Sequence, residues 1–115
     1  MGGQPLDRKP TASPAFVKIQ WTANASNDLI RLHSFLAPVA PEAAATVAQS
    51  LSRAPLRLIE FSRIGERLEA YSPREVRRII VGHYEIRYEL AENSIIILRL
   101  WHMRELRPFE PELPI

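Results

Sequence analysis

The fold is decided by one stretch near the C-terminus, residues 76–105, which reads VRRIIVGHYEIRYELAENSIIILRLWHMRE. It divides into three strand-like runs, and Gly82 and His83 form a tight turn between the first two. Apolar and polar residues alternate over residues 84–90, which is typical of a half-buried strand. Residues 95–101 are almost wholly apolar, which predicts a central strand covered on both faces. The stretch therefore predicts three consecutive strands of one sheet.

A strand and a helix are predicted upstream of this stretch. Alternation over residues 16–21 indicates a short strand with one apolar face. Thr22 follows it and can cap a helix, because its hydroxyl can accept an orphan backbone N–H. Asp28 lies early in that helix, where a carboxylate complements the helix dipole, and Pro38 ends the helix. One buried stripe is expected at helical spacing: Ala25, Leu29, Leu32 and Leu36.

A second helix is predicted to begin at Pro41, because proline suits the first turn of a helix. Pro55 should break or kink it, with a short further helical piece beyond. Residues 62–73 are interpreted as a polar connection around Gly65. The order is strand, helix, helix, strand, strand, strand. It predicts an α+β fold in which a two-helix hairpin packs on an antiparallel sheet.

The length of 115 residues suits a single domain. We expect residues 1–15 to be a disordered arm, because they are rich in glycine and proline and lack the apolar core of a signal peptide. Residues 16–107 would form the domain, and residues 108–115 a proline-rich tail. No apolar run approaches the length needed to cross a bilayer. A cytoplasmic protein with no membrane contact is expected.

The basic residues are mostly arginines, since Lys9 and Lys18 are the only lysines among 15 basic side chains. Arginine suits phosphate and carboxylate partners. A compositional bias that favours arginine, alanine and proline together explains the same excess equally well. The formal net charge of +2 does not choose between these explanations.

Several classes of catalytic site are excluded by the motifs. There is no cysteine, no HExxH spacing, no glycine-rich phosphate loop and no GxSxG elbow, so we expect neither a metal nor a cofactor. A basic and aromatic set near one end of the sheet remains, and such sets bind phosphodiesters or other proteins. Alternatively, Tyr84 belongs to the core and the arginines form a solvated face paired with glutamates. The candidate binding residues are Arg67, Arg77, Arg78, Tyr84, His102, Arg104 and Arg107.

The last three predicted strands resemble those of the RelE/ParE toxin superfamily. That family has a YxIxY strand, a short turn, and an apolar strand ending in a histidine with an arginine after it. Gly65 and Arg67 resemble its usual Gly-Arg pair after the second helix, although Ser62 stands where the family often has proline. The resemblance covers about residues 17–107. The strand residues that carry it are Tyr84, Ile86, Tyr88, His102 and Arg104.

The resemblance implies a toxin of a type II toxin–antitoxin module, often called a plasmid stabilisation protein, that is neutralised by a cognate antitoxin of ParD or similar type. The RelE branch cleaves mRNA on the ribosome with an arginine in the second strand, an arginine after the last strand, a C-terminal tyrosine and basic helix residues. Here Arg104 fits one of these positions, whereas Ile80 occupies the second-strand position. No tyrosine follows Tyr88, and the second helix has no lysine.

The sequence resembles the ParE branch more, including RLWHMRE at residues 99–105. That branch lacks the RNase residue set, and its better-studied members poison DNA gyrase. Three functions therefore remain: a gyrase inhibitor, an mRNA endoribonuclease of RelE type, or a degenerate toxin that keeps only antitoxin binding. Growth arrest on expression would separate the third from the others. A DNA-damage response against a translation block would separate the first two.

Overall fold

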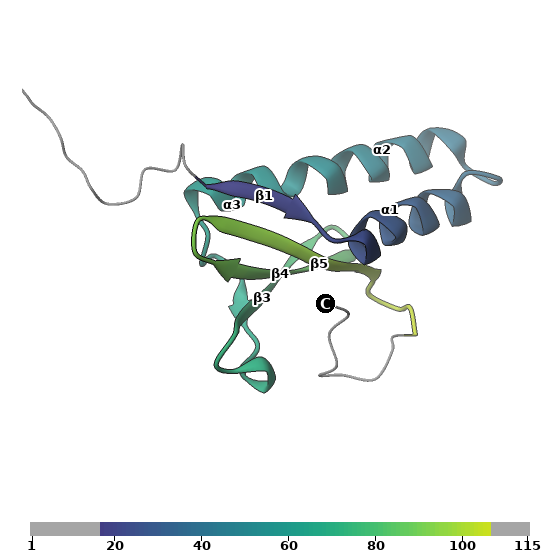
Figure 1. The fold of residues 1–115 in the computed structure, drawn as a ribbon. Coiled ribbons are helices and arrows are strands. Elements are labelled where there is room, and N and C mark those ends of the chain that lie inside the picture. Colours follow the sequence, from purple (N-terminus) through teal and green to yellow (C-terminus); the bar gives the residue numbers. More distant parts are fainter. Residues whose placement is uncertain (1–16, 107–115) are drawn as a thin grey trace, which may run out of the picture.

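The computed structural model describes residues 17–106, and these form the predicted α+β fold. In Figure 1 the hairpin of α1 and α2 lies over one face of the sheet. The strands are β1 (Lys18–Trp21), β2 (Glu66–Arg67), β3 (Glu75–Val81), β4 (Tyr84–Ala91) and β5 (Ser94–His102). The helices are α1 (Ala23–Leu36), α2 (Pro41–Arg53), α3 (Arg57–Glu60) and two 3₁₀ turns, η3 (Ala54–Leu56) and η4 (Glu69–Tyr71).

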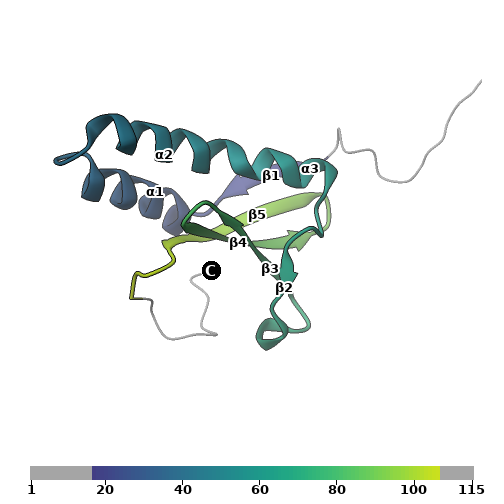
Figure 2. The ribbon, with the colours of Figure 1, turned by 180° about the vertical axis from the view of Figure 1, so that it is seen from behind.

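The sheet is mixed rather than antiparallel throughout, with strand order β1-β5-β4-β3-β2. β1 runs parallel to β5, so that Lys18 pairs with Ser94 and Trp21 with Ile97. Parallel neighbours require a long crossover, which the helical hairpin and the intervening strands supply. β2 arises within the predicted polar connection and pairs with β3 (Figure 2). Its two residues are too few to show any periodicity in the sequence.

β5 is flanked by β1 and β4 and is buried on both faces, as predicted. Ile95, Ile97 and Leu100 pack in the main core beneath the helices. Leu98 is fully buried on the opposite face, in a smaller cluster that includes Tyr71. A bulge opposite β4 omits Leu98 from the strand register, so that Ile97 before it and Leu100 after it both belong to the helix-facing core.

The helical hairpin follows the sequence prediction closely. The Thr22 hydroxyl accepts a hydrogen bond from the backbone N–H of Ala25 at 3.0 Å, which confirms the predicted cap. Ala25 and Ala44 are fully buried where small side chains allow close packing. The helical path breaks around Pro55, where η3 replaces α2 and α3 follows. Asp28 lies beyond the first turn of α1 and points to the sheet, so the predicted dipole role is wrong.

Tyr88 fixes the loop that leads into β2. Its hydroxyl donates to the carbonyl of Ser62 at 2.7 Å and accepts from the N–H of Gly65 at 3.1 Å. A Cβ on Gly65 would lie 2.6 Å from the carbonyl oxygen of Arg78, so only glycine fits this crossing. Burial is the main cause that raises the pKa of Tyr88, and the phenol stays protonated.

Tyr88→Phe is expected to lower the free energy of unfolding by about 1–3 kcal/mol, because it leaves the buried N–H of Gly65 and the partly buried carbonyl of Ser62 without their partner. Urea denaturation of both proteins measures the difference. Tyr84→Phe is the matched control, because the Tyr84 hydroxyl makes no hydrogen bond within residues 17–106. An equal loss in the two variants would contradict this assignment.

Candidate functional site

Three of the predicted site residues meet in one pocket at the open end of the β4–β5 hairpin, opposite its turn. Tyr84 and His102 are register partners, and Arg104 follows directly after β5. They line a cavity of about 440 Å³ that α1 closes from the other side. We call it the α1–β5 pocket. Its lining residues are Arg31, Leu32, Phe35, Leu36, Tyr84, His102, Arg104 and Glu105.

The rings at this pocket are held in a fixed arrangement. The Tyr84 ring meets the His102 ring edge-on at a centroid distance of 5.1 Å, and the His83 ring stacks on His102 at 6.2 Å. His102 Nδ1 accepts the backbone N–H of Arg104 at 3.1 Å. A neutral His102 ring therefore carries its proton on Nε2, which remains available as a donor.

The two arginines of the α1–β5 pocket differ in their charge environment. Arg31 donates to Asp28 at 3.0 Å and to Glu105, so its charge is neutralised twice. Glu105 also accepts the N–H of His102 at 3.0 Å, which fixes it to the end of β5. Arg104 is exposed and has no ion pair within residues 17–106. The pocket therefore offers one unneutralised cation beside apolar walls.

The apolar wall includes Phe35, whose side chain is 83% exposed at the rim. Together with Leu32 and Leu36 it forms apolar surface at the pocket, and contiguous apolar surface of this kind marks sites that contact other molecules. Sequence reasoning missed Arg31 and Phe35. Their spacing of four residues on α1 was a usable signal, because it places both on one helix face beside the predicted apolar stripe.

The other predicted arginines lie elsewhere on the sheet. Tyr84 at the pocket pairs with Val81 of β3, and Arg77 lies four residues earlier on the same strand. Arg77 is therefore about 13 Å along the strand from the α1–β5 pocket. It donates to Glu75 at 2.8 Å and to the carbonyl of Gly65 at 2.6 Å. The hydrogen bond from Arg63 is the main cause that lowers the pKa of the Glu75 carboxyl, and Arg77 lowers it further.

Arg67 and Arg78 also lie outside the α1–β5 pocket. Arg78 binds Glu66 at 2.9 Å and the buried Glu85 at 3.3 Å. Arg67 Nε lies 3.8 Å from Glu69 and has no hydrogen bond within the described part of the chain. The structure thus places only part of the predicted set in the α1–β5 pocket. For Arg77 and Arg78, which bind glutamates, it fits the alternative interpretation of arginines paired with glutamates. Arg107 lies outside the described residues.

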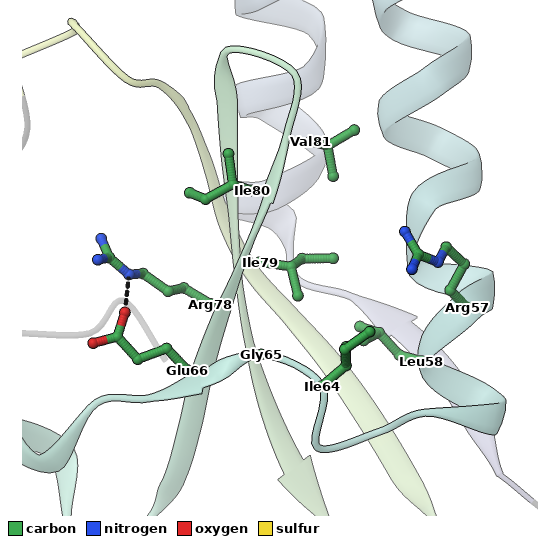
Figure 3. A pocket seen from close by; sticks show the side chains of 9 residues that line it. All are labelled: Arg57, Leu58, Ile64, Gly65, Glu66, Arg78, Ile79, Ile80 and Val81. Atoms are coloured by element: carbon green, nitrogen blue, oxygen red, sulfur yellow. Dashed lines mark hydrogen bonds and ion pairs between the residues drawn. The ribbon is translucent and has the colours of Figure 1, made fainter.

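A second cavity of about 370 Å³ lies between α3 and the edge of β3 (Figure 3). We call it the α3–β3 pocket. Sequence analysis did not predict it, because the residues that line it are distributed over α3, the loop before β2, and β3. They are Arg57, Leu58, Ile64, Gly65, Glu66, Arg78, Ile79, Ile80 and Val81. Within residues 17–106, no cluster of three potential metal ligands occurs, and no helix could span a bilayer.

A family model matches this chain over residues 19–107. Its description is the ParE toxin of the type II toxin–antitoxin system parDE. The chain belongs to the ParE toxin family. The predicted resemblance is confirmed, and this ParE-family chain is the toxin component of a type II system.

The fold of this ParE-family chain is similar to a solved structure described as the chromosomal ParDE TA system from P. aeruginosa. The TM-score is 0.66 at 20% sequence identity, over 77% of this chain and 98% of that chain. No curated protein matches the sequence.

In this ParE-family toxin the two positions that the RelE resemblance assigns to arginines do not share a pocket. Ile80 lines the α3–β3 pocket, whereas Arg104 lines the α1–β5 pocket. The Ile80 side chain is 51% exposed and carries no charge. Tyr88, the last tyrosine of the sequence, is fully buried beneath the helices.

Proposed function

We propose that this toxin inhibits DNA gyrase and that a cognate antitoxin neutralises it in the cytoplasm. The α1–β5 pocket carries the proposal, because it joins the unneutralised Arg104 to an exposed apolar rim at Phe35. A cation beside an exposed aromatic ring is typical of protein-binding hot spots.

The chemistry of the pocket favours binding over phosphodiester cleavage. Cleavage needs a base for the 2′-hydroxyl, an acid for the leaving oxygen and positive charge on the phosphate. Arg104 supplies charge, but Arg31 is engaged by Asp28 and Glu105. His102 would have to serve as both base and acid, and one of its nitrogens already accepts a backbone N–H. These observations support the gyrase-directed function over the RelE-type one.

The test is a supercoiling assay with purified gyrase and toxin. We expect the toxin to inhibit supercoiling and to trap cleaved DNA, and its expression to arrest growth with a DNA-damage response. Arg104→Glu should weaken inhibition at least about tenfold, since reversing a charge at a contact removes about 1.4 kcal/mol or more. Lys18→Glu is the control with the same charge change, because Lys18 is exposed on β1, away from the pocket.

Two results would overturn the proposal. Codon-specific cuts in ribosome-bound mRNA that His102→Ala abolishes would establish the RNase function instead. Expression without growth arrest, combined with intact antitoxin binding, would identify a degenerate toxin.

A further inference from the structure

The three residues that follow β5 form a turn whose backbone is fully hydrogen-bonded; we call it the post-β5 turn. The N–H of Met103 donates to the carbonyl of His83 at 2.8 Å, and the N–H of Glu105 donates to the carbonyl of His102 at 3.0 Å. Between them, the N–H of Arg104 donates to His102 Nδ1 at 3.1 Å. Every N–H group of the turn therefore has an acceptor, and the path of its backbone is defined.

The Glu105 side chain ties the post-β5 turn to two other elements. Its Oε1 accepts the N–H of His102 at 3.0 Å, and its Oε2 is bound by Arg31 Nη1. Arg31 belongs to α1 and also donates to Asp28 at 3.0 Å and to the carbonyl of Leu100 at 3.2 Å. Both oxygens of the Glu105 carboxylate are thus used inside the protein, where they join the turn to β5 and to α1.

The Arg104 side chain has no such support of its own. It is exposed, and its guanidinium makes no hydrogen bond or ion pair within the described part of the chain. The backbone of the post-β5 turn therefore sets the direction in which Arg104 leaves the surface. A long side chain on a mobile segment loses more conformational entropy when a partner immobilises it, so a fixed turn favours binding.

We propose that Glu105 is a positioning residue, which holds the post-β5 turn in the geometry that presents Arg104 to gyrase. It acts through the N–H of His102 and through Arg31. This inference rests on the proposed function, which supplies gyrase as the partner that Arg104 contacts. The Glu105 side chain is 27% exposed and that of Arg31 39%, so their ion pair contributes little to overall stability. Its effect should appear in target binding rather than in unfolding.

Charge alone predicts the opposite result from positioning. If Glu105 only supplied a negative charge beside Arg104, its removal would make this surface more positive. Binding to the acidic partner that an unneutralised arginine selects would then become stronger. Positioning requires that the same change weaken binding, because it releases the turn. The sign of the change therefore separates the two roles.

The first test removes the Glu105 carboxylate from the intact toxin. Glu105→Ala should weaken inhibition of gyrase supercoiling about five- to tenfold, at a urea midpoint of unfolding close to the native one. Glu105→Gln, which keeps an acceptor for the His102 N–H but loses the charge that binds Arg31, should have an intermediate effect. Glu92→Ala is the matched control and should stay within about threefold of native inhibition. Glu92 is exposed in the turn at the other end of β5 and has no ion pair within residues 17–106.

The second test asks whether Arg31 and Glu105 act through one contact. Arg31→Gln and Glu105→Gln should each weaken inhibition, and the double variant should be within about threefold of the weaker single variant. Losses that multiply in the double variant would show that the two side chains act separately, which overturns the proposal.

The third measurement needs no gyrase, because it follows the turn directly. Backbone amide relaxation by NMR reports motion on the picosecond to nanosecond timescale. The Arg104 amide should be as ordered as β5 in the native toxin and in Glu92→Ala, and clearly more mobile in Glu105→Ala. An equally ordered Arg104 amide in Glu105→Ala would overturn the proposal.

The outcomes separate this inference from the proposed function. Stronger inhibition by Glu105→Ala assigns Glu105 the role of a counter-charge and overturns positioning, while gyrase remains the target. Failure of the native toxin to inhibit gyrase overturns the proposed function and, with it, gyrase as the partner of Arg104. The relaxation measurement then still decides whether Glu105 fixes the post-β5 turn.

Discussion

Replacing Asp28 by alanine is expected to lower the free energy of unfolding by about 3–5 kcal/mol. The Asp28 carboxylate is 4% exposed and accepts from Arg99 at 2.7 and 3.1 Å, from Arg31 at 3.0 Å, and from the N–H of Leu100 at 2.9 Å. Its removal leaves the Arg99 guanidinium, which is 17% exposed, without its carboxylate and the buried Leu100 amide without its acceptor, whereas Arg31 keeps its ion pair with Glu105. The loss is large because an uncompensated charge in a buried site costs its desolvation energy.

Urea unfolding near neutral pH measures this effect. Asn27→Ala is the control, because its side chain is exposed on the same helix, and it should change stability by less than about 0.5 kcal/mol. Asp28→Asn should fall between the two, since the amide oxygen can still accept the Leu100 N–H. If Asp28→Ala has the same urea midpoint of unfolding as the native protein, Asp28 does not join α1 to β5 as described.

Glu85→Ala is expected to be about as destabilising, by about 3–5 kcal/mol. Glu85 is fully buried and binds the Arg87 guanidinium at 2.6 and 3.1 Å. Arg87 is 3% exposed, and its guanidinium lies between the rings of Tyr71 and Trp101 at 5.9 and 4.8 Å. The variant removes the carboxylate that Arg87 contacts twice, in a place that water does not reach.

Glu66→Ala is the matched control for Glu85→Ala. Both carboxylates bind Arg78, but the Glu66 side chain is 63% exposed, so its ion pair is solvated and screened. Its removal should cost less than about 1 kcal/mol. Thermal and urea unfolding of the two variants give the comparison. Equal losses would show that burial does not set the strength of these ion pairs.

Much of the fold could be predicted because its elements carry local signals. The Thr22 cap, the turn at Gly82 and His83, and the break at Pro55 each depend on the chemistry of a few adjacent residues. β2 and the parallel pairing of β1 could not be predicted in the same way. Both depend on partners distant in the sequence, and a two-residue strand has no period of its own.

The candidate site was predictable only in part. Tyr84, His102 and Arg104 were found because they lie on or just after strong strand patterns that register brings together. Arg67 and Arg77 were predicted for the same site because they are also basic, but they lie on β2 and β3, outside the α1–β5 pocket. Sequence distance does not show which end of a sheet a side chain occupies. The α3–β3 pocket gave no signal, since the residues that line it come from three segments that only the tertiary structure brings together.

By itself the sequence determined the α+β class, the order of the helices and strands, and the family resemblance. Each of these follows from local periodicity, caps, turns and short motifs. Alternation along β4 also separated an apolar face from a polar one, but it could not show that the polar face is covered. The tertiary structure decided that, because the turn carrying Tyr71 lies against Arg87 and turns an expected surface charge into a buried one.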